Sequence, residues 1–370
     1  MGIPVNTPLL NGNEKKYLIE CIESGWISSE GPFVKAFENK FSNYIGRKSG
    51  IAVANGSAAL DIAVRSVGIS AGDEVLMPTF TIISPAASIV ACGAKPIFVD
   101  SDPITWNMNV NDLEKKITNK TKAIVVVHIY GLPVDMDPVL DLARKYKLKV
   151  IEDAAEMHGQ TYNGKKCGSF GHVSVFSFYP NKHITTGEGG MILTDDASIE
   201  EKCRYYRNLC FEPKRRFVHH ELGWNYRITN LQAALGLAQL EQLEKFIIRK
   251  REIGNLYASL LKGLEGLQQP LSSTSFAENI YWVYGLVVLE NSKKSLETIV
   301  DGLTQKQIGS RPFFWCMHEQ PVFLKKGWYQ NEKYPNAEYM ARNGFYLPSG
   351  LGLTDEEIRI VANSLIEIVT

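Results

Sequence analysis

The sequence predicts an α/β protein built on a mostly parallel sheet with helices on both faces, followed by a smaller α+β domain. Three observations support this prediction. Seven short apolar segments, typical of buried strands, occur between residues 51 and 194. Helical patterns separate several of these segments, and a mixed pattern replaces the alternation after about residue 265. Near-continuous apolar strands separated by helices are typical of parallel sheets covered on both sides.

The elements of this sheet are expected in close succession along the chain. A short amphipathic helix is expected first, over 12–25, because apolar residues recur there at helical spacing up to Gly25. The strands are expected at 51–54, 74–77, 96–99, 123–128, 149–152, 173–178 and 191–194, with helices at 57–67, 84–92 and 136–146. Ligands of such sheets gather beyond the carboxyl ends of the strands, so residues in those places are candidates for a site.

The second domain is expected to begin with a long helix over 229–263 that opens at Thr229. Helices of this length usually bridge domains or pack against a partner chain. After it we expect a strand at 281–289, a helix at 295–303, an extended segment at 311–315 and a C-terminal helix at 354–369. We therefore divide the chain into a large domain, 1–240, and a smaller one, 241–370, that includes the bridging helix.

Composition excludes several classes of function. The 370 residues include 40 basic and 40 acidic side chains, so the formal net charge is +0 and no excess of positive charge favours nucleic acid or an anionic membrane. The six cysteines form no CxxC pair and no metal-ligand spacing, which indicates reduced thiols and no metal site. No apolar run reaches transmembrane length and no signal peptide is recognisable, so we expect a cytoplasmic protein.

Lys182 lies on a loop between two of the expected strands. The strand at 173–178 ends before Pro180, which cannot donate to a sheet ladder, and a glycine-rich run at 187–190 precedes the next strand. A partly desolvated lysine loses its proton more readily than lysine in water, and its neutral amine can form a Schiff base with a carbonyl. The alternative is a solvated surface charge, the usual state of a lysine near a glycine turn.

Other expected strand ends also carry polar residues. Gly56 and Ser57 begin a helix, where unpaired N–H groups and the helix dipole favour a phosphate; the alternative is simple helix capping by Ser57 or by the asparagine before Gly56. Asp153 ends a strand, where it can cap the next segment or hold a cationic ring nitrogen. With Ser177 and the lysine described above, these residues suit a cofactor that has a phosphate, a basic ring nitrogen and an aldehyde. Pyridoxal 5′-phosphate (PLP) is that cofactor.

A series of motifs runs through nearly the whole chain in the order WISSEG, NGSAAL, PTFT, VHIYG, IEDAAE, SFYPNKHITTGEGGM, NYRITNLQAALGLAQLE and SRPFF. In this combination the sequence resembles the DegT/StrS-type nucleotide-sugar aminotransferases, and within them it looks most like the GDP-perosamine synthases. The resemblance implies a fold-type-I PLP aminotransferase that acts as a homodimer with shared active sites. It also implies L-glutamate as amino donor and a nucleotide-linked 4-keto-6-deoxyhexose as acceptor at C-4, for surface polysaccharides such as O-antigen.

The family pattern also implies roles for individual residues. Lys182 would bind the cofactor covalently and Asp153 would pair with its ring nitrogen. Glu156 would lie beside the ring, near its hydroxyl and the incoming sugar. The phosphate would be held by Gly56, Ser57, Ser177 and, from the neighbouring chain, Asn225.

The sequence departs from the family pattern in two places, one that concerns stacking on the cofactor ring and one that leaves the exact substrate open. Ile82 stands where many relatives carry a tyrosine or tryptophan that stacks on the cofactor ring. Tyr179 and Pro180 stand where perosamine synthases usually have phenylalanine and glycine, so dTDP- and UDP-linked keto sugars are alternatives to the GDP-linked one. A dehydratase branch of the family replaces the reactive lysine with histidine, but here Lys182 is present and His183 follows it, which favours transamination.

Further residues are candidate substrate contacts, each with a structural alternative. Arginine offers paired donors that suit a diphosphate or a carboxylate, although a charged run is usually a solvated face. The candidates are Trp26, Ser28, Ser29, His183, Arg215, Arg216 and His318. Two other functions stay open as alternatives: a non-catalytic regulator with the same fold, and a NAD-dependent dehydrogenase. The dehydrogenase is disfavoured because no GxGxxG follows an early strand.

Overall fold

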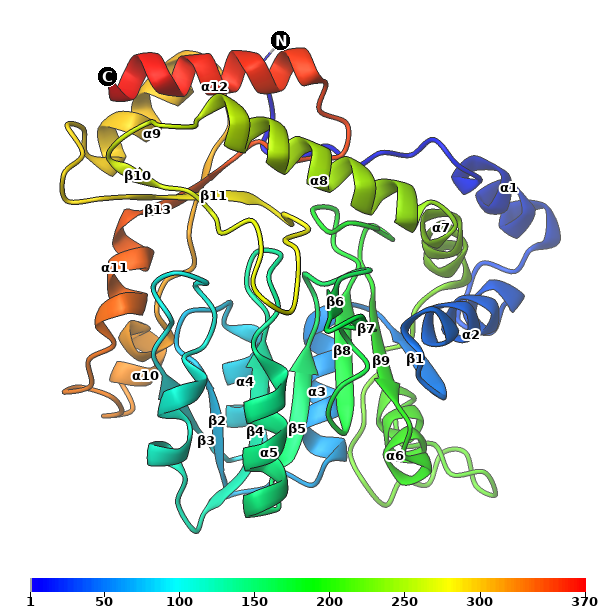
Figure 1. Ribbon diagram of the computed structural model, residues 1–370. Helices are drawn as coiled ribbons and strands as arrows, with labels where there is room; N and C mark the ends of the chain where they lie inside the picture. The colour runs from blue at the N-terminus through cyan, green and yellow to red at the C-terminus, as the bar shows by residue number, and fades with distance from the viewer. Residues whose placement is uncertain (1) are drawn as a thin grey trace.

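The computed structural model describes residues 2–370, and its main feature is a seven-stranded sheet in the order β1-β9-β8-β5-β4-β2-β3 (Figure 1). The strands are β1 (Ser49–Val53), β2 (Glu74–Pro78), β3 (Lys95–Val99), β4 (Thr121–Val127), β5 (Lys149–Asp153), β8 (Val173–Ser177) and β9 (Gly190–Thr194). β9 is antiparallel to both of its neighbours, and the other pairs are parallel. The prediction of seven strands in a mostly parallel sheet is confirmed.

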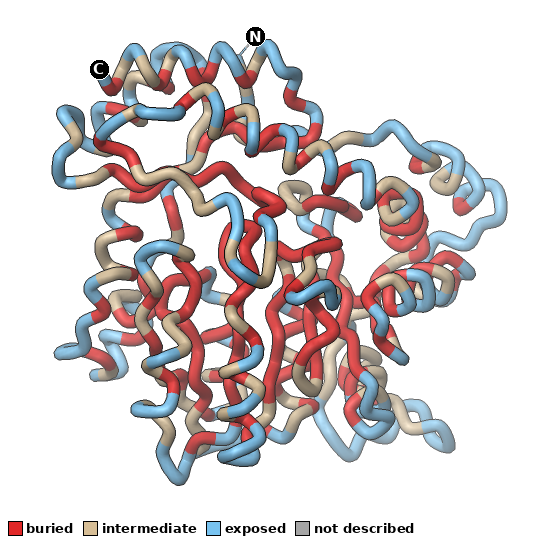
Figure 2. The backbone as a smooth tube through the Cα atoms, viewed as in Figure 1, coloured by how far each residue is buried: buried red, intermediate tan, exposed pale blue. Residues whose placement is uncertain are grey.

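Both faces of this sheet are buried, because successive strand residues belong to two different apolar clusters. Ile51 and Val53 belong to one cluster, whereas Ala52 between them belongs to the other. Figure 2 shows the strands as a buried centre beneath more exposed helices. The first face packs against α3 (Gly56–Ser66), α4 (Ser84–Ala91) and α6 (Ala197–Arg207), and the second against α2 (Pro32–Ile45), α5 (Met136–Tyr146) and α7 (Asn230–Leu240). Among residues 2–370, no helix is long and apolar enough to cross a membrane.

Two of these helices were not predicted. In α2 the buried Phe33, Phe37, Phe41 and Ile45 recur every four residues, so the periodic signal was present in the sequence. In α6 only a few apolar residues are buried, and the clearest signal is the cap at Asp196, whose carboxylate accepts from the N–H groups at the helix start. A mostly polar helix of this kind leaves little periodicity to detect.

The prediction of one long helix over 229–263 is wrong, since the chain forms α7 and then α8 (Leu243–Leu260). The predicted start is confirmed by a capping box between Thr229 and Gln232. The break falls at Glu241, whose carboxylate accepts hydrogen bonds at 2.7 and 2.8 Å from Asn13 and Tyr17, which lie at the start of α1 (Glu14–Ser24). Apolar spacing continues through the break because both helices bury a face, so the sequence does not reveal it.

The C-terminal part contains a second, antiparallel sheet in the order β10-β11-β13-β12 and a third apolar core. Its strands are β10 (Leu267–Gln268), β11 (Tyr284–Val288), β12 (Arg311–Pro312) and β13 (Gly344–Leu347). Its helices are α9 (Leu296–Gln305), α10 (Pro321–Leu324), α11 (Pro335–Asn343) and α12 (Asp355–Val369), the last with the expected capping box. The start of α8 packs in the large core and its end in the third core, so α8 connects the two. The exact division at residue 240 stays a prediction.

The remaining elements are short and connect the main ones. The hairpin of β6 (Thr161–Tyr162) and β7 (Lys165–Lys166) lies between β5 and β8 in the sequence. Three single turns of 3-10 helix occur at Val110–Asp112, Glu114–Lys116 and Met317–Glu319.

Candidate active site

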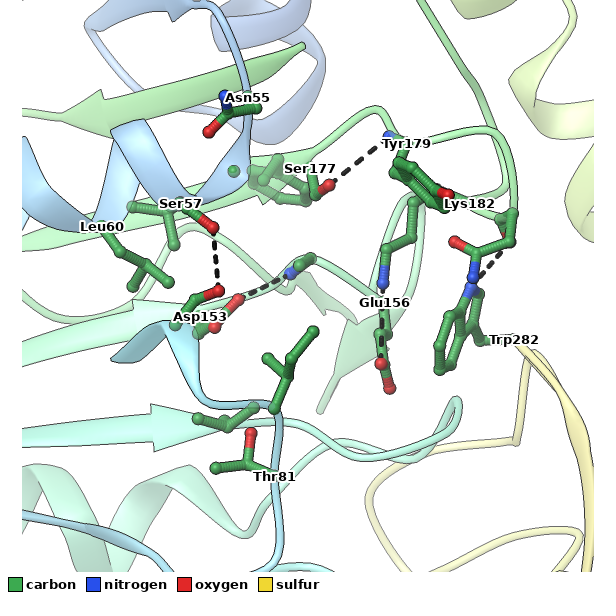
Figure 3. A pocket seen from close by; sticks show the side chains of 18 of the residues that line it. Asn55, Ser57, Leu60, Thr81, Asp153, Glu156, Ser177, Tyr179, Lys182 and Trp282 are labelled. Atoms are coloured by element: carbon green, nitrogen blue, oxygen red, sulfur yellow. Dashed lines mark hydrogen bonds and ion pairs between the residues drawn. The ribbon is translucent and has the colours of Figure 1, made fainter. Parts of the chain in front are cut away.

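A cavity of about 520 Å³ lies beyond the carboxyl ends of β4, β5 and β8 (Figure 3). The start of α3, the ends of these strands and the loop after β8 form most of its wall, and the C-terminal part completes it. Six of the predicted residues line this cavity together: Gly56, Ser57, Asp153, Glu156, Ser177 and Lys182. The structure therefore brings these strand ends together at one cavity, and the roles of the six residues stay predictions.

The start of α3 forms one end of the cavity. The Asn55 side chain accepts a hydrogen bond from the Ala58 N–H at 2.8 Å, so the capping alternative is correct for Asn55. Gly56 and Ser57 then occupy the first helical positions, where backbone N–H groups have no partner within the helix. A Cβ on Gly56 would lie 2.9 Å from the Ser177 Cβ, so glycine is what allows α3 and β8 to meet here. This arrangement suits a phosphate.

Asp153 is the last residue of β5 and is almost completely buried. Its Oδ1 accepts a hydrogen bond from the Ala155 N–H at 3.1 Å, in a turn and not in a helix. Burial raises the pKa of Asp153, an effect that this N–H and the Lys182 charge partly oppose. A cationic group in the cavity would stabilise the carboxylate further, so a protonated ring nitrogen fits this place.

Lys182 and Glu156 form a buried pair, with 3.6 Å between Nζ and Oε1. The second Glu156 oxygen accepts the backbone N–H of Tyr130 at 2.8 Å, which fixes the carboxylate. Burial lowers the pKa of Lys182, although Glu156 opposes the shift, and burial raises the pKa of Glu156 to about 7. A lysine with a lowered pKa supplies the neutral amine that attack on a carbonyl needs.

Some residues of the cavity wall were not predicted. Trp282 is the one closest to the reactive amine, with 3.9 Å between its ring centroid and Lys182 Nζ. It lies in the coil before β11, some distance along the chain from every motif of the site, so no local pattern marked it. The other unpredicted polar and aromatic lining residues include Ser84, Glu188, Phe314 and Tyr346. Ile82 also lines the cavity and is 49% exposed.

Several predicted residues do not line the cavity of their own chain. Trp26 and Ser28 are exposed, and their carbonyls accept hydrogen bonds from Asn230. Arg215 and Arg216 lie in the exposed loop 211–222. Ser29 and Asn225 are also outside the cavity wall. The roles of the first five as substrate contacts stay predictions, as does the role of Asn225 at a neighbouring chain's cofactor.

The two predicted histidines are core residues. His318 is buried, and its ring contacts Thr79 at 2.9 Å and Glu338 at 3.2 Å, so both ring nitrogens have partners in the core. His183 directly follows Lys182 but is buried, 5.7 Å from the ring of His158, and does not line the cavity. Burial lowers the pKa of both His183 and His158, so both rings are neutral.

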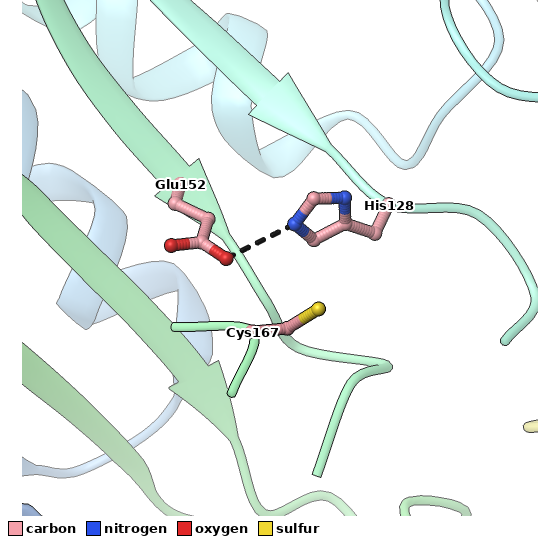
Figure 4. A group of neighbouring side chains, drawn as sticks. All are labelled: His128, Glu152 and Cys167. Carbon is pink, nitrogen blue, oxygen red and sulfur yellow. Dashed lines mark hydrogen bonds and ion pairs between the residues drawn. The ribbon is translucent and has the colours of Figure 1, made fainter. Parts of the chain in front are cut away.

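His128, Glu152 and Cys167 come together in a group that could resemble a metal site (Figure 4). However, His128 Nδ1 accepts the Val134 N–H at 3.0 Å, which leaves the proton on Nε2 to donate to Glu152 at 3.1 Å. The Glu152 oxygens also accept the N–H groups of residues 168 and 170. Burial keeps the pKa of Cys167 well above its usual range. The group is therefore a hydrogen-bonded cluster at the cavity wall, which His128 lines.

Comparison with known proteins identifies the family. The profile of the DegT/DnrJ/EryC1/StrS aminotransferase family matches residues 8–366. The chain belongs to this family. It is 44% identical to GDP-perosamine synthase of Escherichia coli O157:H7, over 99% of this chain and 98% of that protein. It is 41% identical to GDP-perosamine synthase of Caulobacter vibrioides, over 97% of this chain and 96% of that one.

A solved structure supports the same conclusion. The PLP form of the putative sugar aminotransferase Spr1654 from Streptococcus pneumoniae superposes with a TM-score of 0.92 at 25% identity, over 100% of this chain and 99% of that one. The protein is thus a PLP-dependent sugar aminotransferase with the fold that the sequence predicted. The cavity contains the three groups that PLP needs. The start of α3 can bind a phosphate, Asp153 is a buried acid, and Lys182 supplies a buried amine.

Proposed function

We propose that this protein moves an amino group from L-glutamate to C-4 of a nucleotide-linked 4-keto-6-deoxyhexose, as GDP-perosamine synthase does, to make a building block for surface polysaccharides. The observation that carries the proposal is the Lys182 amine, held 3.6 Å from Glu156 in a cavity that also contains Asp153. The similarity to two GDP-perosamine synthases over nearly the whole chain supports the choice of sugar.

Each residue then has a physical role. The N–H groups of Gly56 and Ser57 and the hydroxyl of Ser177 bind the cofactor phosphate, and Asp153 keeps the ring nitrogen protonated. When bound, PLP supplies an electron sink and carries the amino group between the two substrates in a ping-pong exchange. Lys182 moves a proton at its Nζ, as general base and then as general acid.

Glu156 supports the proton transfer by Lys182. Its carboxylate favours the charged form of the lysine, whereas burial favours the neutral form, so the two effects oppose each other at Nζ. A general base works best when its pKa lies near the operating pH; burial shifts the pKa of Lys182 downward from its usual high value, and Glu156 limits that shift. The cavity walls exclude bulk water from the pair, since both side chains are almost fully buried.

The proposal includes a homodimer with shared active sites. Asn225 does not line the cavity of its own chain but would reach the cofactor phosphate of a neighbouring copy. Apolar side chains at the mouth of the cavity support this arrangement, because Ile82 and Tyr179 are each 49% exposed in the single chain. Exposed apolar surface beside a site is typical of a protein interface.

The test is an assay of purified protein with PLP and L-glutamate, offered GDP-, dTDP- and UDP-linked 4-keto-6-deoxyhexoses in turn, with the product identified by mass. We expect a 4-amino-4,6-dideoxyhexose from the GDP-linked sugar and no product with Lys182→Ala. Lys120→Ala is the matched control, because Lys120 is exposed and precedes β4 at the opposite end of the strands. Preference for another nucleotide would support the dTDP or UDP alternative. No turnover of L-glutamate with any of the three sugars would favour the regulatory alternative.

A further inference from the structure

The Lys182 amine contacts two groups, and only one of them is an acid. Its Nζ lies 3.6 Å from Glu156 Oε1 and 3.9 Å from the centroid of the Trp282 ring. Figure 3 shows Glu156 and Trp282 next to the end of the lysine side chain. The face of an aromatic ring attracts a cation within about 6 Å, and tryptophan does so most strongly. Trp282 is therefore placed to favour the positively charged form of this nitrogen.

The Trp282 ring is held in this place from three sides. Its Nε1–H donates to the carbonyl oxygen of Asn181, the residue before Lys182, at 2.8 Å. Its own carbonyl oxygen accepts from Lys250 Nζ at 2.8 Å. Its ring stacks on Tyr130, with centroids 5.8 Å apart and 29° between the planes. Since Tyr130 also donates its N–H to Glu156, both neighbours of the amine are positioned by one residue.

We propose that Trp282 is a positioning residue for Lys182: its ring face stabilises the cationic lysine nitrogen, and its indole N–H fixes the loop so that the amine points into the cavity. The inference rests on the proposed function in that Lys182 is the residue that binds PLP. Trp282 reaches the amine from the C-terminal part of the chain, about 100 residues beyond the loop that it holds. The contact therefore exists only in the folded protein.

The test uses the PLP-loaded protein and reads absorbance, not turnover. The visible band of a lysine-linked cofactor fades when the lysine nitrogen loses its proton, so a pH titration gives the midpoint of that loss. Trp282→Leu removes the ring face, and we expect the midpoint to fall by roughly 0.4 to 1.5 pH units. Trp282→Phe keeps a weaker ring face without the N–H, so its midpoint should lie between those of wild type and Trp282→Leu.

Trp328→Leu is the matched control, since Trp328 packs on Phe323 away from the cavity, and its midpoint should equal that of wild type. An unchanged midpoint in Trp282→Leu, with only a lower melting temperature, would overturn the inference, because a ring that merely fills space changes stability alone. If Trp282→Leu does not fold, Trp282→Phe is compared with wild type by itself.

A second measurement separates this inference from the proposed function. Wild-type protein without a visible band would count against the role of Lys182 in binding PLP. In that case, the rate at which an amine-selective reagent labels Lys182 is followed by peptide mass across pH. Labelling needs the neutral amine, so in Trp282→Leu it should begin at lower pH than in wild type. The same onset in both proteins would overturn the inference.

Discussion

Replacing Lys250 with methionine should remove a pH dependence of stability that this one buried side chain causes. Lys250 lies in α8 and is 3% exposed. Its Nζ donates to the carbonyl oxygens of Trp282 at 2.8 Å and Ser349 at 2.5 Å. No carboxylate forms an ion pair with it anywhere in residues 2–370. Burial therefore lowers the pKa of Lys250 from 10.5 to about 7.

The sign and size of the effect follow from these two pKa values. Below about pH 7 the lysine is charged in both states, so the folded state bears the full cost of burying the charge. Between about pH 7 and 10.5 the unfolded chain binds one more proton than the folded one, so the free energy of unfolding rises with pH. The slope is about 1.4 kcal/mol per pH unit for one group. Above about pH 10.5 the lysine is neutral in both states, so the folded state no longer bears the cost of a buried charge.

Methionine has a similar length but no charge, so Lys250→Met should lack this slope. It also leaves two carbonyl oxygens without their donor, a separate cost of about 1–3 kcal/mol that does not vary with pH. The assay is equilibrium unfolding in urea at fixed protein concentration, at several values between about pH 7.5 and 9.5. Lys245→Met is the control, because Lys245 is an exposed lysine of the same helix. If wild type and Lys250→Met gain stability in parallel as pH rises, the reasoning is wrong.

Three other predictions concern the site. Gly56→Ala places a Cβ 2.9 Å from the Ser177 Cβ and should weaken PLP binding roughly tenfold to a hundredfold, as measured by absorbance titration. Gly352→Ala, whose Cβ would have no neighbour closer than 3.6 Å, should leave binding unchanged; equal effects would contradict the argument. Glu156→Gln removes the carboxylate that favours charged Lys182, so the pH midpoint of proton loss from the lysine-linked cofactor should fall by about one to three units. An unchanged midpoint would show that Glu156 does not affect the protonation of Lys182 in solution. Asn225→Asp should speed loss of PLP in gel filtration by placing a charge beside the neighbouring chain's cofactor phosphate; unchanged retention would count against a shared site.

The sequence revealed the sheet because central parallel strands are buried on both faces. A strand such as 123–127 has to be almost wholly apolar, and this is visible in one sequence. The helices were harder to predict, since their signal is periodic and can be overlooked, as in α2, or weak, as in α6. The break between α7 and α8 depends on contacts of Glu241 with a segment over 200 residues away, which local pattern cannot report.

The residues of the candidate site also differ in how far the sequence could predict them. Gly56, Asp153 and Lys182 could be predicted because each follows or ends a strand, and strand ends of a parallel sheet meet at one edge. Trp282 could not, because its place beside the amine depends on how the C-terminal part packs on the sheet. The roles of Arg215 and Arg216 stay predictions, because the loop that carries them is exposed and does not line the cavity.

The cavity has walls of two different origins. The sheet and the segments that follow its strands supply the Lys182 amine, the Asp153 carboxylate and the phosphate-binding start of α3. Residues beyond 280 supply aromatic side chains such as Phe314 and Tyr346. Substitutions at these two aromatic positions would change the shape of the cavity while the proton-transferring groups keep their geometry. The same chemistry can thus be retained through evolution as the sugar that enters the pocket changes.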